Sequence, residues 1–458
     1  MLPTIHSVFI VGIKGVAMAN IAVLLKKMGK KVTGSDTAEV FITDSLLSQN
    51  ALTVSTGFAL DDIPTDCDLV VYSAAHRGSK NLQVREAIKR AIPTVHQAHL
   101  LGQITASFKN LVAVCGCHGK TTTASLLAYS LLRLQKNPSY LVGAPFFNDY
   151  QGSDFLNTDL FIVEADEYAL DPPADKTPKF NFLHPSHILC TNIDYDHPDA
   201  YKNLDETKEA FAKFLAGGHK LILNAADPVL ASLFPRLRGK NYVTYGRQDA
   251  TLTFSAITTS ARTTTFTATY KNKTIGAFNL SLFGRMNVSN AAGVILTLLE
   301  LGYNSSEIQT AIAGFTGAKR RFELMAKIGD KLLFDDYGHH PNEILATISA
   351  ARDRFPNRRI VVIFQPHTYS RTTVFRREFE RALATADASL VLPVFSSARE
   401  TPEAHSVAPF SDHRLIQLTA KDDLTTILKE LIRPHDVIFT MGAGDVYKLK
   451  DDIIRLLE

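Results

Sequence analysis

Short strand-like runs recur along the chain and alternate with longer segments of helical periodicity. In the N-terminal third, such runs lie at residues 8–12, 31–36 and 68–73, and a helical stretch separates the first two. Short, mostly continuous apolar runs are typical of strands covered on both faces, as in a parallel sheet. Strands that alternate with helices predict an α/β fold with doubly wound topology.

The pattern predicts three domains, which suits a chain of 458 residues. We expect a Rossmann-like domain over 1–108, a central domain over 109–318 and a second Rossmann-like domain over 319–458. Threonine is dense over 251–280, where alternation predicts hairpin strands and a small β appendage to the central domain. The further predicted strands are 111–115, 159–164 and 186–192 in the central domain, and 331–335, 359–364, 388–392 and 436–440 in the third domain.

The overall charge is almost balanced, with 49 basic and 46 acidic side chains and a formal net charge of +3. This balance predicts no bulk electrostatic attraction to nucleic acid or to an anionic membrane. No apolar run reaches the roughly 18 residues of a transmembrane helix, and the N-terminus lacks the pattern of a signal peptide. The four cysteines are too few for a disulfide framework, so we expect a cytoplasmic protein.

The strongest local signal is a glycine-rich turn, Gly116-Cys-His-Gly-Lys-Thr121, between a predicted strand and a predicted helix. This context is typical of a phosphate-binding loop, in which backbone N–H groups and the helix N-terminus face phosphate oxygens. Lys120 is expected to contact the β- and γ-phosphates of a nucleotide, and the Thr121 hydroxyl to ligate Mg²⁺. The loop is two residues shorter than the usual form, and a plain helix start after a glycine turn is the alternative.

Two later strands end in polar residues of the kind that hold metal ions. Glu164 ends the predicted strand 159–164, and a carboxylate at such a strand end can bind Mg²⁺. His197 follows the strand 186–192 with acidic neighbours, so it is expected to be a metal ligand or a donor that orients a carboxylate.

A weaker glycine pattern lies near the N-terminus. Gly12 and Gly15 follow the first predicted strand, and Ser35 and Asp36 end the second. The arrangement fits a nucleotide-binding βαβ unit, and it fits a dehydrogenase or a plain strand–helix turn equally well.

Together these motifs resemble the Mur ligase family, the ATP-dependent amide-forming enzymes of peptidoglycan assembly, and the match runs through nearly the whole chain. The residues that carry the resemblance are Gly116 to Thr123, Glu164 to Glu167, Thr191 to His197, Asn224 to Asp227, Gly284 to Ala292, Lys319 to Glu323, Phe334 to Pro341 and Phe364 to Thr372. The resemblance implies a muramate carboxylate activated by ATP as an acyl phosphate, which an amine then attacks.

Two branches of the family remain open for the amine. The C-terminal motifs, Gln365 to Arg371 and Asp335 to Pro341, look most like the members that join L-alanine to UDP-N-acetylmuramate. The segment from Asp171 to His187 is similar to the recycling members that join a murein tripeptide to the same sugar nucleotide. Because the C-terminal domain carries the amine-binding residues in this family, we favour L-alanine.

The resemblance also implies a role for individual residues. Lys120, Glu164, His197 and His339 are expected to be catalytic, with Thr121, Glu164 and His197 on Mg²⁺. Tyr337, His339 and Arg371 are expected to bind the amine substrate, and Gly12, Gly15, Ser35 and Asp36 the sugar nucleotide. The residues expected to bind ATP are Gly116, His118, Gly119, Lys120, Thr121, Thr122, Asn287, Asn290, Arg320 and Asp335, with Asp336 as the alternative to Asp335.

The chain departs from the family pattern at three positions that bear on affinity. Lys14 and Ala17 stand where relatives usually have glycine, and Met286 stands where they usually have histidine. Three functions of other classes are the alternatives to a ligase. They are a P-loop nucleotide switch, a nucleotide binder without catalysis, and a dehydrogenase built on the N-terminal βαβ unit. No motif separates a monomer from a homodimer.

Overall fold

The computed structural model describes residues 4–156, 158–172, 174–396, 408–419 and 423–458. The chain forms two compact units. The first comprises Met1–Ala256, Phe266–Asn279 and Ser289–Thr316, and the second comprises Ile257–Thr265, Leu280–Val288 and Gly317–Glu458. None of the described helices is long and apolar enough to span a membrane.

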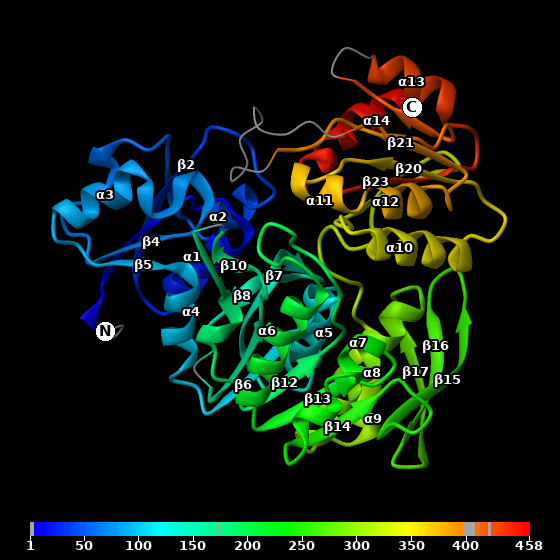
Figure 1. Ribbon diagram of the computed structural model, residues 1–458, viewed down its shortest axis with the longest axis horizontal. Helices are drawn as coiled ribbons and strands as arrows, with labels where there is room; N and C mark the ends of the chain where they lie inside the picture. Colours follow the sequence, from blue (N-terminus) through cyan, green and yellow to red (C-terminus); the bar gives the residue numbers. More distant parts are fainter. Residues whose placement is uncertain (1–3, 157, 173, 397–407, 420–422) are drawn as a thin grey trace. The chain divides into compact units, whose positions relative to one another are not determined.

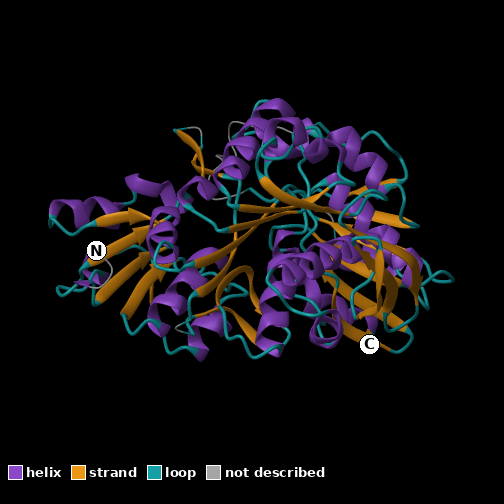
Figure 2. Cartoon of the chain, turned by 90° about the horizontal axis from the view of Figure 1, so that it is seen from below, coloured by secondary structure: helices purple, strands orange, loops and turns teal. Residues whose placement is uncertain are grey.

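The N-terminal part of the first unit is a five-stranded sheet in the order β3-β2-β1-β4-β5 (blue in Figure 1). All its neighbouring strands are parallel, as expected from the sequence. The strands near the N-terminus lie side by side with helices on both sides of them (Figure 2). The elements are β1 (Ser7–Val11), α1 (Val16–Lys27), β2 (Lys31–Asp36), α2 (Asp44–Gln49), β3 (Thr53–Thr56), β4 (Leu69–Tyr72), α3 (Leu82–Lys89), β5 (Thr94–His96) and α4 (Gln97–Thr105).

A ten-stranded sheet follows, in the order β17-β16-β15-β14-β13-β12-β6-β9-β7-β8. Its central strands are parallel and fully buried in their middle residues, which explains their unbroken apolar runs. The elements from its start to β14 are β6 (Asn110–Cys115), α5 (Lys120–Arg133), β7 (Ser139–Phe147), β8 (Tyr150–Asp154), β9 (Leu160–Glu164), β12 (His187–Cys190), α6 (Leu204–Gly217), β13 (Lys220–Asn224), α7 (Pro228–Ala231) and β14 (Asn241–Tyr245).

The threonine-rich segment forms the predicted strands, β15 (Leu252–Thr259), β16 (Thr264–Tyr270) and β17 (Lys273–Leu280). They extend one edge of the central sheet rather than forming a sheet of their own. The helices α8 (Arg285–Glu300) and α9 (Ser305–Ala313) follow.

Several strands of the first unit, such as β7 and β8, have no counterpart in the sequence-based prediction, and one further pair forms a hairpin outside the two large sheets. Between β9 and β12, β10 (Ala169–Asp171) and β11 (Asp175–Pro178) pair as a separate antiparallel hairpin. A single helical turn, η4 (Lys179–Phe182), leads from the hairpin toward β12.

The second unit contains a six-stranded sheet in the order β18-β19-β23-β20-β21-β22, in which β18 alone is antiparallel to its neighbour. This mixed sheet with flanking helices confirms the α/β prediction for the C-terminal domain. Its elements are β18 (Glu323–Ile328), β19 (Lys331–Asp336), α10 (Pro341–Arg354), β20 (Ile360–Phe364), α11 (Tyr369–Val374), α12 (Arg376–Leu383), β21 (Ala388–Val391), β22 (Leu415–Gln417), α13 (Leu424–Leu431), β23 (Val437–Met441) and α14 (Lys450–Leu457).

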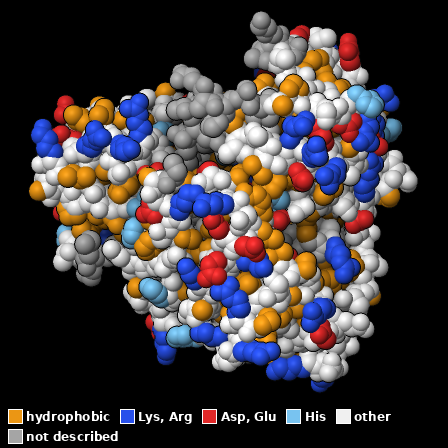
Figure 3. Space-filling view, in the orientation of Figure 1, with side chains coloured by type: hydrophobic (Ala, Val, Ile, Leu, Met, Phe, Trp, Pro, Cys, Tyr) orange, Lys and Arg blue, Asp and Glu red, His pale blue; other side chains and the backbone are white. Residues whose placement is uncertain are grey.

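Charged side chains of both signs stand next to one another over most of the face shown in Figure 3. The view agrees with the near-neutral composition of the chain.

Candidate active site

The predicted phosphate loop lies between the end of β6 and the start of α5. Gly116 has φ of 135° and Gly119 has φ of 79°, values that side chains other than glycine rarely adopt. A Cβ atom would also lie 2.0 Å from Thr191 Oγ1 at position 116, and 2.8 Å from Asn290 Oδ1 at position 119. Both glycines are therefore required by conformation and by space, which a plain helix start would not need.

The Lys120 side chain is folded back onto this loop. Its ammonium donates hydrogen bonds to the carbonyl oxygens of Gly116 (2.6 Å) and Cys117 (3.1 Å). It also lies 3.0 Å from Oε1 and 2.8 Å from Oε2 of Glu167. Burial opposes the charge, but the carboxylates of Glu167 and Asp166 outweigh it and raise the pKa of Lys120. The lysine is thus held charged, as a contact with phosphate requires.

Glu167 was not among the residues singled out from the sequence, although it belongs to the acidic turn after β9. Its side chain is 1% exposed and lies between Lys120 and His197, whose Nε2 is 3.4 Å from Glu167 Oε1. The His197 ring packs on Tyr168, with 4.5 Å between ring centroids. Glu167 lies three residues beyond the end of β9, in a turn without apolar periodicity. No pattern in the sequence therefore indicates where its side chain points.

The donors predicted for Mg²⁺ are a hydroxyl, a carboxylate and an imidazole. Thr121 is buried in the first turn of α5, and Glu164, at the end of β9, accepts a hydrogen bond from Gly143 N at 2.8 Å. Glu164 is the register partner of Val114 in β6, two residues before Gly116, so this carboxylate lies beside the loop. Oxygen donors of this kind suit Mg²⁺, with His197 next to them through Glu167.

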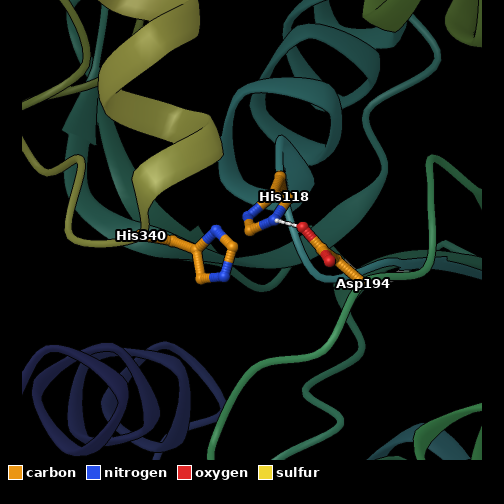
Figure 4. Close-up of side chains that lie close together, drawn as sticks. All are labelled: His118, Asp194 and His340. Carbon is orange, nitrogen blue, oxygen red and sulfur yellow. Dashed lines mark hydrogen bonds and ion pairs between the residues drawn. The ribbon is translucent and has the colours of Figure 1, made fainter. Parts of the chain in front are cut away.

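The loop is also tied to the segment after β12. His118 Nε2 lies 2.9 Å from Asp194 Oδ2 (Figure 4), and His118 N donates to Asn192 Oδ1 at 2.9 Å. Thr191 Oγ1 donates to the carbonyl oxygen of His118 at 2.7 Å. This segment therefore fixes the side of the loop that carries His118, a role that the sequence motif itself did not reveal.

The two asparagines of α8 and Thr122 can be placed individually. Asn290 lies against Gly119 of the phosphate loop, as the contact distance above shows. Asn287 Nδ2 donates to the carbonyl oxygen of Phe283 at 2.8 Å, a bond within its own helix start. Thr122 is buried in the first turn of α5. The roles of all three in binding ATP stay predictions.

The predicted sugar-nucleotide residues meet at the carboxyl ends of β1 and β2. Gly12 N donates to the carbonyl oxygen of Ser35 at 2.9 Å, and Gly15 precedes α1. Asp36 is 1% exposed and accepts hydrogen bonds from the backbone N–H of Lys14 and of Thr37, each at 2.7 Å. The predicted segments thus meet at the edge of the sheet where such folds bind ligands, and their role in binding the sugar nucleotide stays a prediction.

The contacts of two further side chains at this edge, His76 and Lys14, were not predicted from the sequence. His76 Nε2 lies 3.4 Å from Asp36 Oδ1, and His76 was not predicted from the sequence. Although burial opposes it, the His76 hydrogen bond and the two backbone N–H bonds lower the pKa of Asp36. The Lys14 ammonium, by contrast, donates to the carbonyl oxygen of Glu39 at 2.8 Å and lies 3.5 Å from Asp44.

In the second unit, Arg320 and Asp335 form a buried ion pair. Arg320 Nε donates to Asp335 Oδ2 at 2.8 Å, and its other nitrogens donate to the carbonyl oxygens of Gly444 (3.2 Å) and Gly442 (2.6 Å). The other Asp335 oxygen accepts a hydrogen bond from Thr440 Oγ1 at 2.7 Å. In this arrangement both residues form hydrogen bonds within the second unit. That they contact ATP stays a prediction.

Aromatic rings lie next to two of the three residues predicted to bind the amine, Tyr337 and His339. The Tyr337 and His339 rings are 5.3 Å apart, and His339 is 6.4 Å from the ring of His367, which the sequence reasoning quoted but did not select. His367 stacks on Phe395 at 5.7 Å. Arg371 is 4% exposed in α11, directly after this loop. The residues follow β19 and β20, which lie on either side of β23 and parallel to it, so both loops leave the same edge of the sheet.

Models of three family domains match successive parts of the chain. They are the Mur ligase family catalytic domain over residues 7–109, the Mur ligase middle domain over 114–298 and the Mur ligase glutamate ligase domain over 320–444. The chain is 34% identical to the UDP-N-acetylmuramate–L-alanine ligase of Desulfatibacillum aliphaticivorans, over 98% of this chain and 98% of that protein. The chain is a member of the Mur ligase family. It is thus an ATP-dependent, amide-forming ligase, as the motifs predicted.

Further relatives agree with this assignment. The ligase is 34% identical to the UDP-N-acetylmuramate–L-alanine ligase of Salinibacter ruber, over 100% of this chain and 96% of that protein. The crystal structure of UDP-N-acetylmuramate-alanine ligase from Thermotoga maritima has a TM-score of 0.79 at 25% identity, with 98% of both chains covered. A murein peptide ligase from Psychrobacter arcticus shares the fold, with a TM-score of 0.75 at 23% identity and 99% and 98% coverage.

Proposed function

We propose that this ligase joins L-alanine to the carboxylate of UDP-N-acetylmuramate, with ATP and Mg²⁺, in the synthesis of peptidoglycan precursors. The near full-length likeness to relatives of that name carries the proposal. An intact phosphate loop with a charged Lys120 supports the use of ATP, because an ammonium group at this place can contact the triphosphate. We also propose that the reaction takes place in the cytoplasm, where ATP is supplied.

The chemistry proceeds in two steps that the residues can serve. A carboxylate oxygen attacks the γ-phosphorus of ATP, and the bond between this phosphorus and the β–γ bridging oxygen breaks. The products of this step are an acyl phosphate and ADP. The amine nitrogen then attacks the acyl carbon, the tetrahedral intermediate loses phosphate, and the nitrogen loses a proton. Lys120 and the N–H groups of the loop stabilise the charge of the transferred phosphoryl group.

The metal ligands are assigned by their donor atoms. Thr121, Glu164 and His197 would hold Mg²⁺, with Glu167 beside them. When bound, the ion reduces the repulsion between the carboxylate and the triphosphate and offsets the charge of the transferred group. Glu167 would then exchange its contact with the Lys120 ammonium for one with the metal site, which leaves the lysine to the nucleotide.

The amine site is assigned to the second unit. Arg371 would bind the α-carboxylate of the amino acid through two parallel hydrogen bonds, a geometry that guanidinium groups favour. Tyr337 and His339 would line the pocket next to it, and His339 would take the proton that the amine loses. The rings of His367 and Phe395 leave this part of the site largely aromatic, which suits an amino acid with one small apolar side chain.

A murein tripeptide is the second candidate for the amine. It is favoured by one observation, the hairpin of β10 and β11, which occupies the segment that is similar to the recycling enzymes. A panel of amines with UDP-N-acetylmuramate and ATP decides between them: L-alanine, L-serine, glycine and murein tripeptide, followed as ADP release and product mass. Fastest turnover with L-alanine supports the proposal, and faster turnover with the tripeptide would replace the amine but keep the sugar nucleotide.

A further inference from the structure

The segment from Ala169 to Phe182, which we call the hairpin segment, is anchored in the central domain. Phe180 N donates to the carbonyl oxygen of Asp166 at 2.9 Å. The Phe180 ring stacks on Phe214 of α6, with centroids 4.3 Å apart and the planes 4° from parallel. The helical turn that carries Lys179 is therefore fixed, and the lysine is not on a freely moving loop.

The Lys179 ammonium faces the acidic turn beside the phosphate loop. It lies 2.8 Å from Asp166 Oδ2 and 5.0 Å from the centroid of the Tyr168 ring. The same Tyr168 ring packs on His197, which is next to Glu167 and hence to Lys120. Lys179 is thus a second ammonium group close to the residues predicted to transfer the phosphoryl group.

The hairpin segment also contacts the carboxyl edge of the N-terminal sheet. The Phe182 ring lies 4.0 Å from the ring of His99 in α4, and Asp171 lies against Gly78 in the loop after β4. Burial and, next, the charge of Lys179 lower the pKa of His96, at the end of β5, to about 3. Lys179 therefore lies between the edge that would hold the sugar nucleotide and the loop that would hold the triphosphate.

A cation at this place would add to the effect of the metal ion. The carboxylate of the sugar nucleotide must approach the γ-phosphate, and the two anions repel each other when no positive charge stands between them. In the described part of the chain, Asp166 Oδ2 is the hydrogen-bond acceptor of the Lys179 ammonium, which has three N–H donors. The side chain is 14% exposed, so a ligand can still reach it.

We propose that Lys179 binds the lactyl carboxylate of UDP-N-acetylmuramate and guides it to the phosphate loop. The inference rests on the proposed sugar nucleotide and adds a residue that recognises its acidic group. Asp166 would hold the ammonium in place. The hairpin segment would be the part of the central domain that recognises the carboxylate of the sugar nucleotide. Lys179 would release no proton in the reaction, since its task is to bind the carboxylate.

The test compares two sugar nucleotides that differ in this carboxylate. Binding of UDP-N-acetylmuramate and of UDP-N-acetylglucosamine, which lacks the lactyl group, is measured by titration calorimetry on the full-length ligase. Lys179→Met is expected to weaken binding of UDP-N-acetylmuramate at least 10-fold and to change binding of UDP-N-acetylglucosamine less than 2-fold. Lys179→Arg should keep most of the affinity. Lys176→Met is the matched control, because Lys176 is exposed in the same hairpin.

The outcomes separate this inference from the proposed function. Equal loss for both sugar nucleotides in Lys179→Met would show a merely structural role and overturn the inference alone, as would unchanged binding of both. If the unaltered ligase failed to bind UDP-N-acetylmuramate, the proposed function would fall and the inference with it. Asp166→Asn adds a second readout, because it removes the partner of Lys179 but leaves its charge. A loss equal to that of Lys179→Met would mean that the ion pair, rather than the substrate contact, matters.

Discussion

The Lys120 ammonium lies 2.8 Å from Oε2 of Glu167, and the carboxylate that neutralises it is almost completely buried. The lysine that is expected to bind the triphosphate therefore already has an anionic partner when no nucleotide is bound. The pair solves a problem of the nucleotide-free state, since a buried ammonium without a partner costs several kcal/mol. It also implies that nucleotide binding exchanges one anionic partner of Lys120 for another.

Replacing Lys120 by Ala should lower turnover by about 10²-fold or more, because the γ-phosphate loses a cation that stabilises the transition state. ADP release with saturating substrates is the measurement. Lys202→Ala serves as the control, since the Lys202 side chain is 78% exposed and pairs with the surface residue Glu206. ADP formation near the unaltered rate in Lys120→Ala would contradict the assignment of the phosphate loop.

Replacing Glu167 by Gln should destabilise the nucleotide-free ligase by about 3 kcal/mol, the usual cost of breaking a buried ion pair on one side. Binding of an ATP analogue should then stabilise the variant more than it stabilises the unaltered ligase, because the triphosphate supplies the missing anion. Thermal denaturation with and without the analogue measures both effects. The matched control is Glu209→Gln, which breaks an exposed pair with Arg236 in the same domain.

Equal shifts for Glu167→Gln and Glu209→Gln would show that the buried pair contributes nothing. Exposed pairs are usually worth less than about 1 kcal/mol, so the two variants should differ clearly.

The sequence predicted the sheets well and the contacts between loops less well. The strand predicted at 111–115 could be located because burial on both faces leaves an unbroken apolar run. The phosphate loop was recognisable because Gly116 and Gly119 mark its backbone. Glu167 and His76 were missed because neither ends a strand nor repeats a spacing. Their positions follow from how separate loops meet, which local sequence does not encode.

The hairpin segment is a second part of the structure that sequence patterns did not predict. Its residues were noticed only through resemblance to another branch of the family, because strands of three and four residues carry too little periodicity to be predicted. Arg320 and Asp335 illustrate a further gap, since the sequence offered them as ligands of ATP and the structure pairs them with each other.

Replacing Arg320 by Met should destabilise the ligase by about 3 kcal/mol or more, because Asp335 would stay buried without its partner. Chemical denaturation measures the loss, and Arg247→Met is the control, since the Arg247 pair with Asp249 is exposed. If Arg320 instead acts chiefly on a phosphate, the variant would keep its stability and raise the KM for ATP. The double variant Arg320→Met, Asp335→Leu should recover much of the lost stability.

Asp336 should give the ligase a specific pH dependence of stability. Burial raises the pKa of Asp336 to about 6, against 3.8 in the unfolded chain. Between these values the folded state binds a proton that the unfolded state releases, so stability falls as pH rises through the window. From pH 5 to pH 7.5 this contribution is on the order of 1 kcal/mol. The fall in denaturation midpoint over this range should be smaller in Asp336→Asn than in the unaltered ligase, and equal falls would contradict the raised pKa.

Replacing Arg371 by Ala should raise the KM for L-alanine by about 10- to 100-fold, the scale of losing hydrogen bonds to a charged group. Affinity for UDP-N-acetylmuramate should change less than about 2-fold, because the sugar nucleotide is assigned to the first unit. Initial rates over a range of L-alanine concentrations and calorimetric titration of the sugar nucleotide measure the two effects. The denaturation midpoint is recorded for each variant, since Arg371 is buried.

Arg371→Lys is the matched variant that keeps the charge. An ammonium group cannot reproduce the two parallel hydrogen bonds of the guanidinium, so the KM for L-alanine should lie between those of Arg371→Ala and the unaltered ligase. A pocket distinguishes one methylene by about 1–3 kcal/mol, so glycine and L-serine should be poorer substrates that remain measurable in all three proteins. If Arg371→Ala lost affinity for the sugar nucleotide as much as for L-alanine, the arginine would not be the group that binds the amino-acid carboxylate.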